Sequence, residues 1–206
     1  MGFYDNRILP LLIDVGCGAG PIQKQRAKVV PLAEGRVLEV GMGSGLNLSF
    51  YDPTRIEYVW GLEPYAGMRR KASPRVAAVP FEIKWLELPG EEIPLDDHSA
   101  DTVLLTYTLC TIPDFRKALA QMRRVLKPGG KLLFAEHGAA PDENIRKWQD
   151  RINPLWKRIA GGCHINREIP RLLEDGGFKV ETVDTMYLPG PIKIASFQYW
   201  GVASER

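Results

Sequence analysis

A short strand followed by a glycine-rich turn constrains this chain more than any other feature. Residues 37–40, Val-Leu-Glu-Val, form a mostly apolar run typical of a buried strand. Gly41, Gly43 and Gly45 follow at alternate positions. Glycine suits a tight turn and leaves room for a ligand to approach the backbone. The chain after Gly45 can begin a helix whose amino end faces that ligand. The pattern therefore predicts an α/β fold with a ligand at this turn.

A carboxylate after the next apolar run indicates the kind of ligand. Glu63 follows residues 58–62, and a carboxylate about 20 residues beyond such a turn suits two vicinal ribose hydroxyls. A dinucleotide-binding loop would carry its last glycine where this chain has Leu46. The pattern thus favours another nucleoside cofactor over NAD. An NAD-dependent oxidoreductase and a non-catalytic binding protein remain the alternatives from other classes.

A second glycine triplet, Gly16, Gly18 and Gly20, competes with the first. Residues 21–32 after it are expected to be helical, and the following strand, 36–40, already ends at the other triplet. For a ligand at this second triplet, the carboxylate that binds the ribose would have to be Glu39, which lies in mid-strand. We therefore interpret residues 13–20 as a loop within an N-terminal helical extension, residues 1–33.

Strands and helices alternate along the rest of the chain. We expect further strands at 58–62, 81–86, 100–107, 131–136, 178–184 and 194–202, and helices at 65–72, 115–126, 142–159 and 167–175. This order predicts a Rossmann-like, seven-stranded, mostly parallel sheet with helices on both faces. Residues 34–206 would form this core within a single domain spanning 1–206. The carboxyl ends of its parallel strands should meet at one edge, where ligands bind.

Composition excludes several classes of function. The 27 basic and 25 acidic residues give a net charge of +2, which predicts no nucleic-acid partner. Cys17, Cys110 and Cys163 show no Cys-x-x-Cys spacing, so we expect neither a disulfide framework nor a metal site, and a cytoplasmic location. The apolar run 8–13 is too short to cross a bilayer, so no integral membrane segment or signal peptide is predicted.

Four segments together resemble the class I S-adenosylmethionine (SAM) methyltransferases. Residues 37–45 resemble their first motif, and residues 101–107 resemble their fourth-strand motif. Glu63 resembles the acidic residue with which they bind the ribose. Residues 125–130, Val-Leu-Lys-Pro-Gly-Gly, are similar to the signature that precedes their fifth strand. The resemblance covers roughly residues 34–203. It implies the Rossmann-like fold, SAM as the cofactor and a small-molecule methyl acceptor.

A narrower similarity bears on the acceptor. Glu136-His137, the tryptophan-bearing helix 142–159 and residues 162–168 resemble the methyltransferase-like 7 group, whose animal members methylate alkyl thiols. Residues 91–101 also resemble the ubiquinone and menaquinone C-methyltransferases. An alkyl thiol is therefore the first expectation, with a lipid amine or a quinone precursor as the alternative. Those quinone enzymes bind adenine with an Asp-Ala pair. This chain has Pro89-Gly90 at those positions, whose side chains offer adenine no hydrogen-bond acceptor.

The resemblance also implies the residues of the site. The cofactor would contact Glu39, Gly41, Gly43, Gly45, Glu63, Pro64, Met68, Gly90, Glu91, Thr106, Tyr107 and Thr108. Methyl transfer requires alignment, exclusion of water and, for some acceptors, removal of a proton. His137 and His164 are the candidate bases, because histidine titrates near neutral pH. Tyr107 lies where the methyl group should point. The oligomeric state is not predicted.

Overall fold

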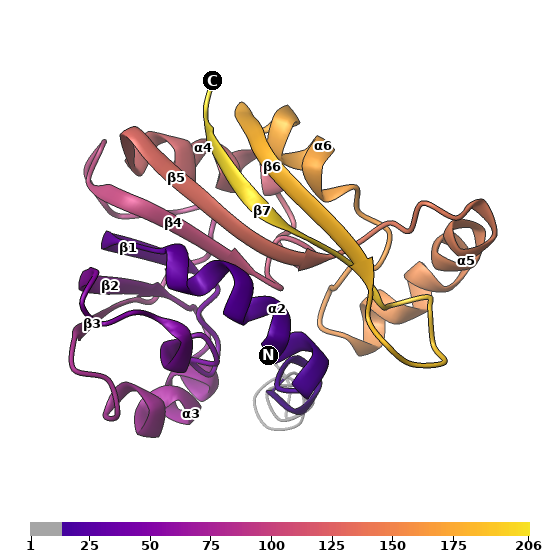
Figure 1. Cartoon of the computed structure of the whole chain (residues 1–206), viewed down its shortest axis with the longest axis horizontal. Coiled ribbons are helices and arrows are strands. Elements are labelled where there is room, and N and C mark those ends of the chain that lie inside the picture. Colours follow the sequence, from indigo (N-terminus) through magenta and orange to yellow (C-terminus); the bar gives the residue numbers. More distant parts are fainter. Residues whose placement is uncertain (1–13) are drawn as a thin grey trace.

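A seven-stranded sheet runs through the protein in the computed structural model, which describes residues 14–206 (Figure 1). Its strands are β1 (Gly35–Val40), β2 (Ile56–Leu62), β3 (Glu82–Leu86), β4 (Ala100–Thr106), β5 (Leu126–His137), β6 (Phe178–Tyr187) and β7 (Phe197–Glu205). Their order is β3-β2-β1-β4-β5-β7-β6. The first five in that order pair in parallel, whereas β7 is antiparallel to both of its neighbours. The predicted Rossmann-like, mostly parallel sheet is confirmed.

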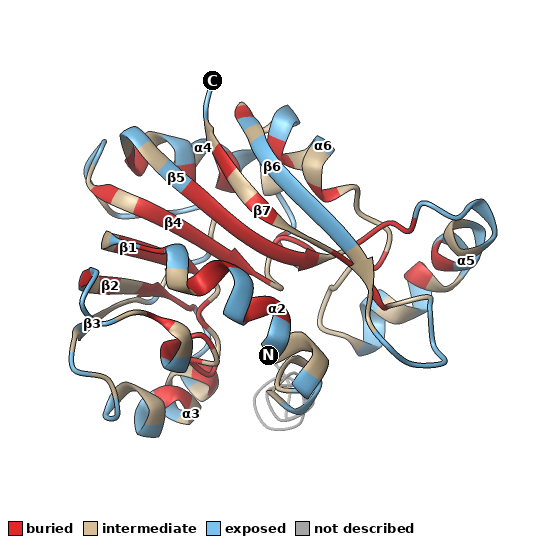
Figure 2. Ribbon diagram, viewed as in Figure 1, coloured by how far each residue is buried: buried red, intermediate tan, exposed pale blue. Residues whose placement is uncertain are grey.

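The central strands are buried on both faces, which explains their almost continuous apolar sequence. In β4, Val103 and Leu105 contribute to one hydrophobic cluster and Leu104 to the other. In β5, Leu132 and Phe134 lie on the first side and Leu133 on the second. Side chains of a strand point alternately to opposite faces, so these residues divide into two cores. Figure 2 shows β4 and β5 as the most continuously buried strands.

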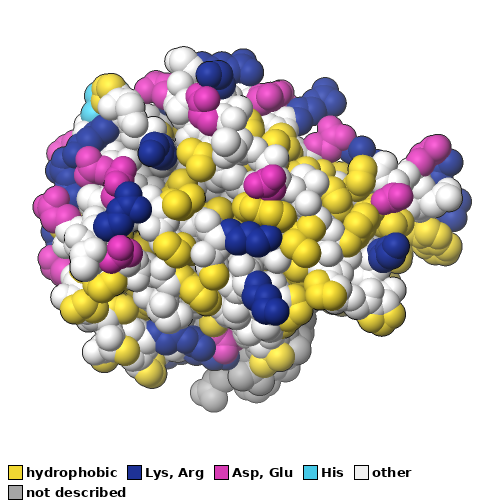
Figure 3. All heavy atoms as spheres, in the orientation of Figure 1, with side chains coloured by type: hydrophobic (Ala, Val, Ile, Leu, Met, Phe, Trp, Pro, Cys, Tyr) yellow, Lys and Arg dark blue, Asp and Glu magenta, His cyan; other side chains and the backbone are white. Residues whose placement is uncertain are grey.

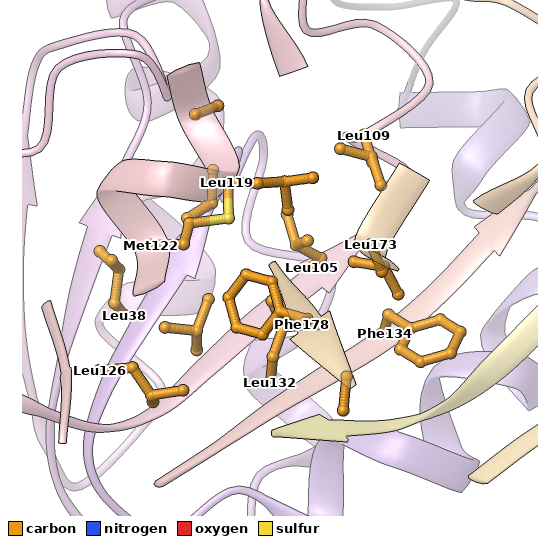
Figure 4. Packing of buried hydrophobic residues seen from close by; sticks show 14 of the residues in the cluster. Leu38, Leu105, Leu109, Leu119, Met122, Leu126, Leu132, Phe134, Leu173 and Phe178 are labelled. Atoms are coloured by element: carbon orange, nitrogen blue, oxygen red, sulfur yellow. The ribbon is translucent and has the colours of Figure 1, made fainter. Parts of the chain in front are cut away.

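Helices cover both faces of the sheet. The first core is closed by α4 (Phe115–Val125) and α6 (Ile169–Asp175), whose Leu119, Met122 and Leu173 meet the strands (Figure 4). Asp114 caps α4 by accepting a hydrogen bond from the Lys117 amide. The second core lies under α2 (Gly20–Val29), η2 (Val30–Leu32), η3 (Leu48–Phe50) and the end of α3 (Ala66–Val76). Figure 1 shows α2 in front of the sheet and α4 behind it.

The longest helix, α5 (Glu143–Ile159), projects from one edge of the molecule (Figures 1 and 2). The segment after it returns to the sheet, where the His164 amide donates to the Cys110 carbonyl. Over residues 14–206, no helix combines the length and apolarity needed to cross a membrane. Figure 3 shows basic and acidic side chains interspersed over one face of the molecule.

Several predicted boundaries are wrong, each for a local reason. The described part of the presumed loop 13–20 is helical at residues 14–17, and α2 already begins at Gly20. After Gly45 the chain makes only the short η3, because Pro53 soon prevents a longer helix. Pro74 lies inside α3 rather than stopping it, since a proline in the last turn removes few hydrogen bonds.

The later elements also differ at their ends. The predicted helix 167–175 begins at Ile169, and the fifth strand starts at Leu126, directly after α4. The sixth strand extends to Tyr187 and the seventh begins at Phe197 rather than at residue 194. Edge-to-face contacts of Phe197 with Tyr187 and Tyr199 favour this longer hairpin.

Candidate active site

The carboxyl ends of β1, β2 and β4 meet at one edge of the sheet. Val40, the last residue of β1, pairs with Leu62 on one side and with Leu105 on the other. The three strands therefore end together, and the segments that follow them form the candidate site. This is the edge at which the sequence predicts a ligand.

The glycine turn needs glycine for two separate reasons. Gly41 and Gly43 have φ angles of 70° and 58°, in the left-handed region that other residues rarely adopt. A Cβ on Gly41 would overlap the side chain of Thr108, so the turn packs directly on the segment after β4. A Cβ on Gly43 would lie 3.4 Å from the Met68 Cε. The turn therefore leaves bare backbone beside α3.

Glu63 ties the end of β2 to the glycine turn. Its Oε2 accepts a hydrogen bond from the Gly43 amide at 3.0 Å, and its Oε1 accepts one from the Tyr65 amide at 2.9 Å. Burial raises the pKa of this carboxyl, although the two amide donors oppose that effect. Each oxygen keeps a free lone pair, so the carboxylate can accept two further hydroxyl protons.

A buried polar network lies beneath the turn. Glu39 accepts hydrogen bonds from the Asn47 amide group at 2.8 Å and from the Tyr51 hydroxyl at 2.7 Å. Arg26 of α2 donates to Asn47 at 2.7 Å and to the Thr106 hydroxyl at 2.6 Å. Burial raises the pKa of Glu39 to about 7. The network joins the N-terminal extension to the ends of β1 and β4.

The extension also contacts the turn through Asp14. Asp14 accepts a hydrogen bond from the Ser44 hydroxyl. It also forms ion pairs with Lys71 at 2.9 Å and Arg75 at 3.3 Å, both on α3. A cavity of about 550 Å³ lies between these segments. It is lined by Asp14, Val15, Gly18, Gln23, Leu46, Ser49, Phe50 and Arg75. Because this lining contains neither Glu63 nor any residue of the β4 end, we do not assign it to the ribose.

The chain leaves β4 through an unusual conformation. Tyr107 has φ of 55°, which is uncommon for a residue with a side chain and occurs often at functional sites. Its hydroxyl donates to the Gln198 side chain of β7 at 2.8 Å. Burial raises the pKa of Tyr107 well above its usual range, so the phenol stays protonated. The phenol is therefore protonated and bound to β7, an arrangement that does not suit a base.

Two charged residues hold the segment after Tyr107. The Glu136 Oε1 accepts from the Thr108 amide at 2.7 Å and from the Leu109 amide at 2.9 Å. Arg167 donates to the carbonyls of Leu109 and Ile112. The other Glu136 oxygen is buried and has no hydrogen-bond partner among the described residues. The segment is thus fixed from both sides, and one carboxylate oxygen remains available.

The two candidate histidines occupy different environments. The His137 Nε2 lies 3.1 Å from the Cys163 sulfur, and the Cys110 sulfur is close to both atoms. The ring of His164 contacts Asn153 of α5, and burial lowers its pKa to about 4. His164 is therefore uncharged at neutral pH and faces α5. Only His137 lies in the cluster beside the ends of β4 and β5.

The structure brings together most of the predicted cofactor residues. Gly41, Gly43, Glu63, Met68 and Thr108 surround the turn as expected. Gly45 also has positive φ and packs on Leu48, and Pro64 is exposed beside Glu63. Gly90 lies near Val40 and Ile112, while Glu91 accepts from the Asp114 amide. Glu39 and Thr106 lie below the turn in the buried network.

Sequence reasoning missed Arg26, Asn47, Tyr51 and Gln198. These residues come from α2, the segment after the glycine turn, and β7. No local pattern marks them, because their roles depend on partners far away in sequence. Cys110 is buried and lies in the cluster with His137, which sequence spacing did not indicate.

Comparison with known proteins identifies the class. Residues 38–134 match the methyltransferase domain family. The chain is 35% identical over 166 residues to the human thiol S-methyltransferase TMT1B, covering 78% of this chain and 67% of that protein. The chain belongs to the SAM-dependent methyltransferases.

A second relative and a solved structure agree with this class. Human thiol S-methyltransferase TMT1A is 32% identical over 145 residues, covering 69% of this chain and 59% of the relative. A SAM-dependent methyltransferase from Mesorhizobium loti shares the fold, with a TM-score of 0.66 at 18% identity over 92% of this chain and 99% of that one. The chain thus spans between 59% and 67% of the length of the two human thiol methyltransferases. SAM is the cofactor that this family and fold imply.

Proposed function

We propose that this enzyme transfers a methyl group from SAM to the sulfur of an alkyl thiol. The observation that carries the proposal is the 35% identity to TMT1B, a thiol S-methyltransferase. Two cysteines and a histidine beside the ends of β4 and β5 agree with it.

The residues at the glycine turn fit SAM. Glu63 would accept the two ribose hydroxyls, because each of its oxygens has one amide donor and room for another. Gly43 would let the cofactor approach the backbone, since its missing side chain leaves the turn open beside Met68. Bound SAM supplies an electrophilic methyl group on a sulfonium centre. Pro89 and Gly90 provide no side-chain acceptor for adenine, so backbone groups would have to bind the base.

The chain's own residues then have to position the acceptor and exclude water. Tyr107, Glu136 and Arg167 fix the segment after β4, which packs directly on the glycine turn. A rigid segment of this kind keeps an acceptor aligned, and alignment contributes much of the rate of a displacement reaction. We further propose a reducing compartment such as the cytoplasm, because the three cysteines are free.

An amine is the second candidate acceptor. The partnerless Glu136 oxygen is buried near the ends of β4 and β5, and a carboxylate there could accept a hydrogen bond from an ammonium group. The thiol and amine proposals therefore predict different substrates for the same site.

A matched acceptor series tests the proposal. Hexanethiol, hexylamine and hexanol share one chain and differ only in the nucleophilic atom. With methyl-labelled SAM, we expect the label in hexanethiol alone. The Gly43→Val variant measures the uncatalysed reaction, because its added side chain should prevent cofactor binding. Labelling of hexylamine without hexanethiol would overturn the thiol proposal and favour the amine.

A further inference from the structure

Three side chains of the types that bind metals meet beside the candidate site although they are far apart in sequence. Cys110 follows β4, His137 ends β5, and Cys163 lies in the segment after α5. Their two sulfur atoms and one ring nitrogen all lie within 4.8 Å of one another, and the His137 Nε2 is 3.1 Å from the Cys163 sulfur. Cysteine spacing along the sequence gave no sign of this cluster, because each member comes from a different element.

The donor set is specific in its chemistry. Thiolate sulfur and imidazole nitrogen are the usual ligands of Zn²⁺, with bonds of about 2.3 Å and about 2.0 Å. Tetrahedral coordination with such bonds separates the ligand atoms by about 3.5 to 4 Å. The cluster is close to this size, so the side chains need to move little. Two thiolates would also balance the charge of the ion.

The number of ligands matters as much as their kind. Structural zinc sites are closed by four protein ligands, whereas catalytic sites use three and keep one position open. No fourth cysteine, histidine or carboxylate joins this cluster among the described residues. Cys110 is buried, but His137 and Cys163 are only partly so. An ion held here would therefore keep one coordination position without a ligand from the described residues.

We propose that Cys110, His137 and Cys163 bind a zinc ion whose open position takes the sulfur of the acceptor thiol. This inference rests on the proposed thiol function. As the two cysteine sulfurs and the acceptor sulfur bind the ion, their thiol protons pass to water. The acceptor sulfur then bonds the methyl carbon while the bond from that carbon to the SAM sulfur breaks, which releases S-adenosylhomocysteine, and nothing is oxidised or reduced. A metal-bound thiol is deprotonated at neutral pH, so the ion would deliver the thiolate that methyl transfer requires.

Cobalt provides a direct test of the metal site. Co²⁺ takes the place of Zn²⁺ in tetrahedral sites and gives a sulfur-to-metal charge-transfer band. The reduced, metal-free enzyme should bind one Co²⁺ with this band. Cys110→Ser, Cys163→Ser and His137→Gln should each weaken that binding by more than about tenfold.

Cys17→Ser is the matched control, because Cys17 is the one cysteine outside the cluster. It should bind Co²⁺ as the wild type does. Calorimetry with S-adenosylhomocysteine checks that every variant is folded. A wild-type protein without the band, or a band that survives in all three cluster variants, would overturn the metal site.

The open position has its own test. Hexanethiol added to the cobalt enzyme should shift the charge-transfer band, whereas hexanol should not. An unchanged band would overturn the assignment of the acceptor to the metal. Full thiol turnover by metal-free enzyme would refute the role of zinc and leave the proposed function intact. A cobalt site that responds to hexanethiol, in an enzyme that methylates no thiol, would instead refute the proposed function alone.

Discussion

Replacing Glu63 by alanine should weaken binding of S-adenosylhomocysteine, the demethylated cofactor, through two losses. The variant lacks the carboxylate that would accept the ribose hydroxyls, and charge-assisted hydrogen bonds of this kind contribute about 1.5 to 3 kcal/mol each. It also lacks the bonds to the Gly43 and Tyr65 amides, at 3.0 and 2.9 Å, that hold the glycine turn against β2. Water can replace part of the lost hydrogen bonding, so we expect the free energy of binding to become less favourable by about 1 to 3 kcal/mol. This corresponds to about a 5- to 150-fold increase in Kd.

Isothermal titration calorimetry measures that change directly. Glu82→Ala is the control, because Glu82 is an exposed carboxylate at the start of β3 and forms an ion pair only with Lys84 within residues 14–206. It should leave the affinity unchanged. Circular dichroism confirms that both variants fold. Unchanged affinity in a folded Glu63→Ala protein would refute the assignment of Glu63 to the ribose.

Three further predictions follow from the same site. Gly43→Val should abolish S-adenosylhomocysteine binding in calorimetry. Gly16→Ala should change the affinity by no more than about twofold, because its added Cβ meets nothing within 4 Å. Equal effects of the two substitutions would mean that the wrong glycine triplet was chosen. Glu39 has a folded pKa of about 7 against 4.5 for the free group, so its proton stabilises the fold fully below pH 4.5 and that stabilisation is lost as the pH rises through 7. Urea unfolding should show that Glu39→Gln reduces this decline, and an identical pH dependence in both proteins would contradict the burial argument. Tyr107→Phe should lower the free energy of unfolding by about 1 kcal/mol, because it removes the bond to Gln198, and should leave cofactor affinity unchanged.

The sequence predicted the parts of the molecule that depend on local patterns. The apolar run of β1, the glycine turn and Glu63 are close in sequence or follow the periodicity of strand and helix. Side chains of a strand alternate between the two faces of the sheet, so the apolar runs 103–105 of β4 and 132–135 of β5 contribute to both cores. These features were sufficient for the fold class, and they are the basis of the proposed cofactor site.

The parts that sequence reasoning missed depend on long-range contacts. Arg26 lies on a largely polar helix, and only the folded protein shows that it is buried against Asn47 and Thr106. The cluster around His137 is similar, because its members become neighbours only when β4, β5 and the segment after α5 pack together. Spacing rules detect metal ligands that share one loop, and they fail when each ligand comes from a separate element.

The position of β7 has a consequence for how the protein is made. The ribosome produces this strand after all the others, yet it pairs with β5 and separates that strand from β6. Until β7 emerges, β5 has one free edge, although its Leu132, Leu133 and Phe134 are fully buried in the finished sheet. An unpaired apolar edge can recruit a strand from another nascent chain. Because β6 and β7 pair as one hairpin, their arrival can cover that edge in a single step, and delayed or failed hairpin closure would leave the chain open to aggregation.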